Sequence, residues 1–224
     1  MTPFATIWDR AVARHGEASL REHFPTVKTA EELAALPDDR YLAAVAERVF
    51  AAGFRWRVIQ AKWEGFEAAF AGFDLDHVAH LDGPAIEALA QDTRIVRNRP
   101  KILSTIENAR WMQEVSAEHG GFGRWIAAWP TTDTVGLWAA MKAGGHRLGG
   151  DTGAWVLRLV GRDTFRISGD VVACLIDAGV VDKKPTGKKD LAATQAAFNA
   201  WQAETGLSQG ALSVVAARSV GAID

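Results

Sequence analysis

Cysteine is almost absent from this chain, which carries only Cys174 among its 224 residues. One thiol cannot form an internal disulfide, and it excludes a thiolate-rich zinc or iron–sulfur site. His77 and His80 are spaced to share a helix face, but no third ligand accompanies them. We therefore expect no metal and no other cofactor.

Long apolar runs are also missing, since no stretch approaches the roughly 20 residues of a membrane span. The first residues lack a basic segment followed by an apolar core, so we expect a cytoplasmic protein with no membrane partner. The net charge is only −2. Such a balance gives no overall attraction to nucleic acid, and any affinity for DNA must come from local basic patches.

Alternating runs of Val, Ile and Thr, which are typical of strands, are missing as well. Apolar residues instead recur at helical spacing, as in Ile102, Ile106, Ala109 and Met112. The spacing predicts an all-α fold, with further helices near 4–14, 30–35, 39–52, 84–91, 122–129, 133–143, 152–160, 170–178, 188–204 and 208–219. We expect one two-lobed domain over 1–224, with a central lobe at about 40–145 and a second lobe from 1–39 plus 146–224.

Nine tryptophans stand against one tyrosine. Packing in the core explains most of them. Trp8, Phe50 and Trp56 differ because they flank segments with polar or charged residues, so they are candidates to line a pocket for a flat ligand.

A glycine-rich stretch, Arg147–Gly153, opens an apolar helix, and Asp170 follows beyond that helix. Exposed N–H groups at such a helix start form an anion site that suits a backbone phosphate. The same glycines also fit an ordinary helix cap or turn, and an aspartate before an apolar run also fits an N-cap. The pattern alone leaves both interpretations open.

Two further segments carry a resemblance to a known family. The first contains an Ala-Gly-x-x-Trp turn at 52–56, and the second, about forty residues later, contains Ile95-Val96-Arg97-Asn98, then Lys101-Ile102 and finally Asn108-Ala109-Arg110. In this order they resemble the DNA-3-methyladenine glycosylase I family over about residues 40–112. Residues 148–182 are similar to the wider helix-hairpin-helix glycosylase superfamily, in which a hairpin is followed by a helix and an aspartate. The corresponding hairpin of this chain lies near 144–153.

The resemblance implies a two-lobed helical glycosylase, and the chain departs from it in three places. The family binds a structural zinc with two cysteines and two histidines, which this chain cannot supply. The family's base-recognising glutamate, eight residues before the turn tryptophan, is Arg48 here, with Glu47 one place earlier. In the hairpin, Gly149 replaces a proline and Thr152 replaces a glycine.

A base-excising enzyme flips its target into an aromatic pocket, so the resemblance assigns a role to several residues. The base pocket is expected from Trp56, Phe50, Glu47 and Trp8. Phe54 and Arg55 are placed to fill the gap left by the flipped base, although Phe54 also fits a hydrophobic staple across the turn. Contacts to DNA are expected from Phe54, Arg55, Arg97, Lys101, Arg147, Gly150, Thr152 and Gly153.

Asp170 is the candidate catalytic residue, because one carboxylate can stabilise an oxocarbenium-like sugar and orient water. No lysine nucleophile stands in the hairpin. The resemblance implies a DNA N-glycosylase that excises alkylated purines such as 3-methyladenine from damaged double-stranded DNA in base excision repair. Without such a lysine we expect it to be monofunctional, and we also expect a monomer. A non-catalytic helix-hairpin-helix protein that binds damaged DNA is the alternative, and a helical protein with a protein partner is a third.

Overall fold

The computed structural model describes residues 1–221, and these form helices with no strand among them. The all-α prediction is confirmed. The chain divides into two compact units. We call residues 28–129 and 138–160 the central unit, and residues 1–27, 130–137 and 161–221 the terminal unit.

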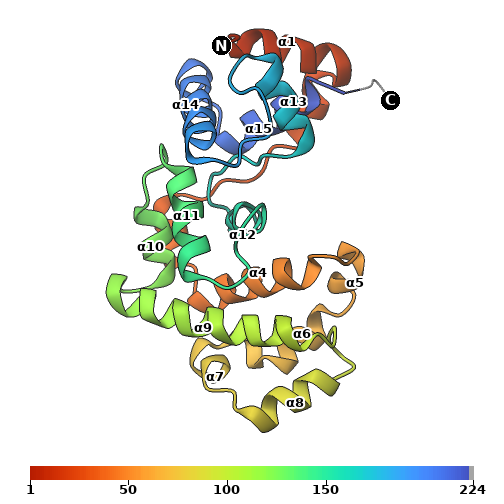
Figure 1. Cartoon of the computed structure of the whole chain (residues 1–224), viewed down its shortest axis with the longest axis vertical. Coiled ribbons are helices and arrows are strands. Elements are labelled where there is room, and N and C mark those ends of the chain that lie inside the picture. The colour runs from red at the N-terminus through yellow and green to blue at the C-terminus, as the bar shows by residue number, and fades with distance from the viewer. Residues whose placement is uncertain (222–224) are drawn as a thin grey trace. The chain divides into compact units, whose positions relative to one another are not determined.

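The central unit holds most of the helices and is coloured from orange to green in Figure 1. Its elements are α3 (Ala30–Ala35), α4 (Asp38–Ala51), α5 (Trp56–Gln60), α6 (Trp63–Ala69), η1 (Ala71–Phe73), α7 (Leu75–Ala79), α8 (Gly83–Gln91), α9 (Arg99–His119), α10 (Phe122–Ala128) and α12 (Thr152–Val160). Helix α11 (Thr134–Gly144) has its first residues in the terminal unit and the rest in the central unit.

Helix α9 is the long central element of this unit and packs against α4, α7, α8 and α10 (Figure 1). It begins where the Asn98 side chain accepts a hydrogen bond from the Lys101 amide at 3.2 Å, with Pro100 in the first turn. It ends at Gly120, which adopts φ +74°. The residues predicted to form its buried face, Ile102, Ile106, Ala109 and Met112, are all at most 1% exposed.

A single carboxylate joins three helices of the central unit. Asp38, the first residue of α4, accepts hydrogen bonds from the Ser116 hydroxyl of α9 and from the Phe122 amide at the start of α10 (2.9 Å). Negative charge at a helix N-terminus is favourable, and the bond also satisfies an amide that has no partner within α10. The end of α9, the start of α10 and the start of α4 are therefore held together.

The terminal unit consists of α1 (Phe4–His15), α2 (Glu17–Glu22), α13 (Gly169–Asp177), α14 (Lys188–Thr205) and α15 (Gln209–Arg218). Helix α15 packs against α1, α2, α13 and α14. Its N-terminal amides at Gln209 and Gly210 donate to the Asp163 carboxylate, each at 2.9 Å. The ring of Phe165 stacks on Phe198 with centroids 4.2 Å apart, which places an aromatic pair in the core of this unit.

The boundaries of the two units differ from the expected lobes. Residues 28–39 and 146–160 belong with the central helices, because α3 packs against α10 and α12 packs against α4. Residues 130–137 belong to the terminal unit, where Thr134 donates to the Gln209 side chain at 2.6 Å. The helices expected from apolar spacing are present within a residue or two of their predicted bounds.

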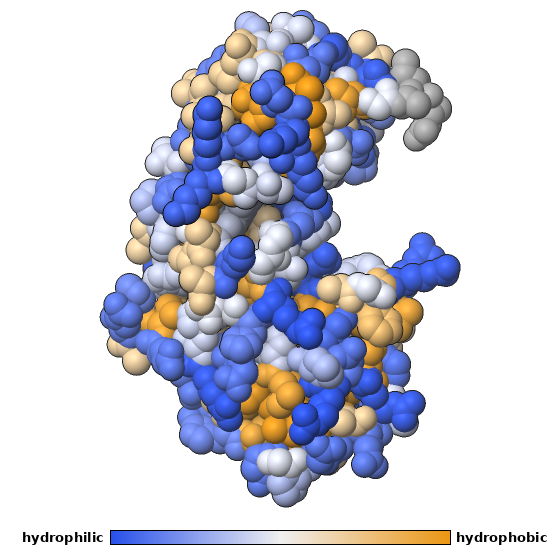
Figure 2. Space-filling model, in the orientation of Figure 1, coloured by the Kyte–Doolittle hydropathy of each residue, from blue (hydrophilic) through white to orange (hydrophobic). Residues whose placement is uncertain are grey.

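No helix within residues 1–221 combines the length and the apolar character needed to cross a membrane. Apolar surface in Figure 2 forms separate patches among hydrophilic residues.

We predict that Gly123→Ala destabilises the central unit by about 1–3 kcal/mol, the usual cost of overpacking a filled site. A Cβ at Gly123 would overlap the Leu33 carbonyl oxygen and lie 3.0 Å from the Tyr41 ring, where α10 meets α3 and α4. Gly83→Ala is the control, since a Cβ there meets nothing within 4 Å. Urea unfolding of the three proteins measures the difference, and equal midpoints for the two variants would contradict the close packing.

Candidate functional site

The turn between α4 and α5 presents apolar side chains to solvent. Phe54 is 46% exposed, Trp56 39% and Val58 40%, and they alternate with the exposed Arg55 and Arg57. Within residues 1–221, the other large apolar side chains with similar exposure are Met1, Val27, Leu159 and Ile176, which are separated from one another in the sequence. A protein keeps such a cluster on its surface at a cost in free energy, so its presence indicates a binding surface.

The buried side chain of Lys101 supports the start of this turn. Its side chain is only 6% exposed, and Nζ donates to the backbone carbonyls of Phe50 (3.0 Å) and Ala52 (2.5 Å) at the C-terminal end of α4. A cation is favourable at that end of a helix because unpaired carbonyls gather there. The ammonium also lies 4.8 Å from the Phe54 ring centroid.

Burial lowers the pKa of the Lys101 ammonium, and the nearby positive charge of Arg147 lowers it further. Lys101 was expected to contact DNA, but its Nζ is engaged with two carbonyls beneath the surface. The structure therefore places it as a support for the turn rather than on the exposed basic track.

Arg48 lies beside two indole rings. Its guanidinium carbon is 4.4 Å from the ring centroid of Trp155, on α12, and 5.3 Å from that of Trp56. Guanidinium groups are attracted to the faces of aromatic rings, and tryptophan is the strongest partner. Trp155, to which the sequence pattern assigned no role, thus contacts the same guanidinium as the expected base-stacking residue Trp56.

Glu47 is half-buried and accepts a hydrogen bond from the Gln60 side chain. Burial raises the pKa of this carboxyl, and the hydrogen bond from Gln60 and the charge of Arg48 oppose the rise. Glu47 lines a hollow of about 270 Å³ together with Arg40, Trp63 and Glu67. Trp56 is not among the residues that line this hollow.

Phe50 is buried within the central unit, and Trp8 belongs to the other unit. Phe50 is fully buried, with its ring centroid 4.7 Å from that of Phe66, so it has no exposed face for a base to stack on. Trp8 belongs to α1 in the terminal unit, where the Arg21 guanidinium lies 5.3 Å from its ring centroid. Of the expected pocket residues, Trp56 contacts Arg48, and Glu47 is the residue before Arg48 in the sequence.

The hairpin before α12 is anchored to α9 by a buried asparagine. The Asn108 side chain donates to the His146 carbonyl at 3.0 Å and accepts from the His146 amide at 2.8 Å. The Ser104 hydroxyl donates to the same carbonyl at 3.3 Å. Because this pairing satisfies both backbone groups of His146, the hairpin has a fixed place on α9.

The hairpin backbone itself requires positive φ at two positions, Arg147 (+61°) and Gly150 (+64°). Around Gly150 a Cβ would meet nothing within 4 Å, so the backbone there is open to a large partner. Gly153, in contrast, is buried, and a Cβ there would lie 3.1 Å from the Leu148 carbonyl oxygen. Gly150 is thus the open point of the hairpin, and Gly153 lets α12 pack closely against it.

Five further arginines expected on the basic track are all exposed, and they differ in whether they form an ion pair. Arg55, Arg97 and Arg147 are exposed. Arg94 forms an ion pair with Asp92 at 2.7 Å, and Arg99 forms one with Glu87 at 2.9 Å. The first group leaves charge available to an anionic partner without breaking an ion pair within the protein.

Asp170 is the second residue of α13 and is exposed. The N-cap of that helix is Ser168, whose hydroxyl accepts from the Val171 amide at 3.3 Å. Capping, the alternative role considered for Asp170, is thus performed by Ser168. Asp170 belongs to the terminal unit and the hairpin to the central unit.

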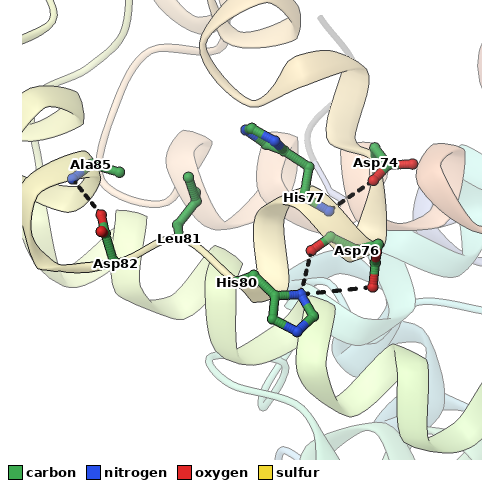
Figure 3. Close-up of a pocket in the computed structure, with 7 residues that line it drawn as sticks. All are labelled: Asp74, Asp76, His77, His80, Leu81, Asp82 and Ala85. Carbon is green, nitrogen blue, oxygen red and sulfur yellow. Dashed lines mark hydrogen bonds and ion pairs between the residues drawn. The ribbon is translucent and has the colours of Figure 1, made fainter.

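An open hollow of about 600 Å³ lies on the α7–α8 side of the central unit (Figure 3). Three carboxylates line it, Asp74, Asp76 and Asp82, together with His77 and His80. Asp74 and Asp82 cap α7 and α8, and His80 Nδ1 lies 2.7 Å from the Asp76 carbonyl. This negative lining would repel phosphate, so the hollow is not a DNA-binding surface.

The zinc site implied by the family resemblance does not fit this chain. Such a site needs two thiolates, and Cys174 is the only cysteine. That thiol is buried, and the Ser219 hydroxyl donates to it at 3.5 Å. Across residues 1–221 no group of three or more histidine, cysteine or acidic side chains is arranged to hold a metal ion.

Comparison with known proteins identifies the segment that carries the turn, Lys101 and Asn108. Residues 37–143 match the family model for methyladenine glycosylase. Over this segment the chain is similar to the methyladenine glycosylase family. The curated relative DNA-3-methyladenine glycosylase 1 of Escherichia coli strain K12 is 41% identical over 59 residues, which are 26% of this chain. The match spans about a third, 32%, of that relative's length.

Solved methyladenine glycosylase structures share the fold. A mutant of 3-methyladenine DNA glycosylase I from Staphylococcus aureus, with glutamine in place of a glutamate, has a TM-score of 0.52 at 18% identity, covering 76% of this chain and 93% of its own. A 3-methyladenine DNA glycosylase I variant solved in complex with 3-methyladenine has a TM-score of 0.51 at 18% identity, covering 65% and 84%. At this identity the likeness concerns the fold alone.

We predict that Glu47→Gln removes part of the pH dependence of stability. The pKa of Glu47 is raised in the folded state, so below the ordinary value of 4.5 its contribution is fully present, and it is lost as the pH rises through the folded pKa. Thermal unfolding between about pH 4 and pH 7 should therefore show the wild type losing stability relative to the variant. Parallel curves for the two proteins would show that Glu47 does not titrate in this window.

Proposed function

We propose that the protein is a monofunctional DNA N-glycosylase that excises alkylated purines such as 3-methyladenine in base excision repair. The observation that carries the proposal is the exposed Phe54–Trp56 turn, which lies in the family-matched segment and is supported by buried Lys101. A turn of aromatic and arginine side chains suits both entry into a base stack and contact with phosphates.

We assign the following roles to residues of the central unit. Gly150 and Thr152 bring the hairpin backbone to a phosphate, and Arg55, Arg97 and Arg147 add positive charge. Gly153, also expected at the phosphate, is buried and instead lets α12 pack closely against the hairpin. Phe54 and Arg55 fill the gap left by the flipped nucleotide. Trp56 stacks on the flipped base, and stacking on an aromatic side chain contributes on the order of 1–3 kcal/mol.

Asp170 is the proposed catalytic carboxylate. The bond between C1′ of the deoxyribose and the purine nitrogen breaks, its electron pair leaves with the base, and the carboxylate stabilises the positive sugar. Water then adds to C1′, and its proton passes to Asp170 as general base. The assignment rests on the sequence order of hairpin, helix and carboxylate.

The proposed substrate is damaged double-stranded DNA, bound by a cytoplasmic monomer.

Replacement of the family glutamate by Arg48 favours considering a second function, a protein that binds damaged DNA without excising the base. Methylated duplex separates the two functions, because released bases can be measured by chromatography. Release of methylated purines above a no-protein control supports the glycosylase, and tight binding without release supports the second function.

We predict that Asp170→Asn abolishes base release while binding to an abasic-site analogue stays within a few-fold. The carboxylate acts on the transition state more than on the ground state, so its loss lowers kcat and leaves affinity nearly unchanged. Single-turnover base release and a binding titration measure the two effects. An Asp170→Asn variant that keeps most of its activity would remove this residue from the mechanism.

We predict that Gly150→Asp weakens binding to damaged and undamaged duplex alike, because it places a negative charge where a phosphate is expected to bind. Gly150→Asn is the matched control, since asparagine tolerates the same positive φ and carries no charge. The slope of log K against log salt should fall by about 0.9 for each phosphate that the variant no longer neutralises.

Trp56→Ala should behave differently from Gly150→Asp, with weaker binding to damaged duplex only. Equal losses on both duplexes for both variants would contradict the separation into a phosphate grip and a base surface.

A further inference from the structure

The Arg48 guanidinium lies over the rings of both Trp155 and Trp56, so it adjoins the surface on which a base stacked on Trp56 would lie. Its guanidinium is nearer to Trp155 (4.4 Å) than to Trp56 (5.3 Å), so Trp155 holds the group and Trp56 keeps a 39% exposed side chain. Lys101 fixes the end of the same helix by its bonds to the Phe50 and Ala52 carbonyls. Residues of the central unit therefore hold both the Arg48 side chain and the end of the helix that carries it.

A guanidinium donates hydrogen bonds, whereas a carboxylate accepts them. A guanidinium carries five N–H donors and no acceptor, so it can keep protein partners on one edge and bind a ligand with another. Guanine offers two adjacent acceptors, O6 and N7, and arginine binds this pair with two parallel hydrogen bonds. Adenine places an amino donor where guanine has O6, so the same arginine faces a donor there.

We propose that Arg48 is a specificity-determining residue that turns the Trp56 site toward alkylated guanines with free O6 and N7 atoms, such as 3-methylguanine, in preference to 3-methyladenine. The inference rests on the proposed glycosylase function and refines its substrate class. Both lesions carry a positive charge on the purine in DNA, so repulsion by Arg48 affects them similarly. The exocyclic group, an oxygen or an amine, is what distinguishes them.

Glu47 does not restore the adenine preference. Its carboxylate is half-buried, accepts from Gln60 and lines the hollow beside Trp63 and Glu67. The acceptor needed for an adenine amino group is therefore directed to a different hollow, and Arg48 is the charged side chain that contacts the Trp56 ring.

The test measures a ratio, that of 3-methylguanine to 3-methyladenine released from duplex DNA methylated with dimethyl sulfate, by chromatography with mass detection and relative to the amount of each lesion present. Arg48→Glu should lower this ratio at least about ten-fold, because one bidentate pair is removed and an acceptor for the adenine amine is introduced. Arg48→Lys keeps the charge without the planar fork and should lower the ratio in the same direction by a smaller factor. It also provides a result if the glutamate variant fails to fold.

Arg57→Glu is the charge-matched control on the exposed side of the same turn. It should reduce release of both bases in the same proportion and leave the ratio unchanged. A ratio that is unaffected in both Arg48 variants, with bases still released, overturns the inference and leaves the glycosylase intact.

A second measurement does not depend on catalysis. Quenching of tryptophan fluorescence by free 3-methylguanine and free 3-methyladenine should give tighter binding of 3-methylguanine to the wild type and the opposite order for Arg48→Glu. The absence of any base release by the wild type would overturn the proposed function. Equal binding of the two free bases by the wild type would overturn the role of Arg48.

Discussion

The exposed turn depends on the two hydrogen bonds that the buried Lys101 ammonium donates to the end of α4. Taking a lysine out of water is costly, and the lowered pKa reflects that cost. Bonds to the Phe50 and Ala52 carbonyls offset it at the end of α4, where such carbonyls have no partner within the helix. The result is a turn with a fixed start, so that exposed Phe54 and Trp56 are held in place rather than left to collapse onto the surface.

The hairpin is also held by a buried polar side chain of α9. Asn108 pairs both backbone groups of His146, and Arg147 is close enough to Lys101 to influence its pKa. Helix α9 therefore supports the turn with one buried polar side chain and the hairpin with another. A buried polar group that is fully hydrogen-bonded specifies a single arrangement, because any displacement leaves it without partners.

Most of the helices could be predicted from sequence because apolar spacing reports which elements form. Helix α9 illustrates this, since Ile102, Ile106 and Met112 all face the core as expected. The spacing does not report what an individual polar or aromatic residue contacts. Lys101 was interpreted as a surface cation and Phe50 as a pocket ring, yet both are buried by partners far away in the sequence, the end of α4 and the Phe66 ring.

Trp155 shows the opposite limit, because a helix tryptophan carries no sign of function until Arg48 is found beside it. The lobe boundaries were also beyond the sequence. Packing of α3 on α10 and of α12 on α4 decides them, and such contacts between distant segments leave no local pattern.

We propose that the 52–58 turn and the 146–152 hairpin form the surface that binds DNA. Amide hydrogen exchange of the whole protein, alone and with methylated duplex, tests it directly. We predict that the amides of both segments gain protection on binding, while those of the acidic hollow at 74–85 show no change (Figure 3). Protection confined to other helices, with both segments unaffected, would contradict it.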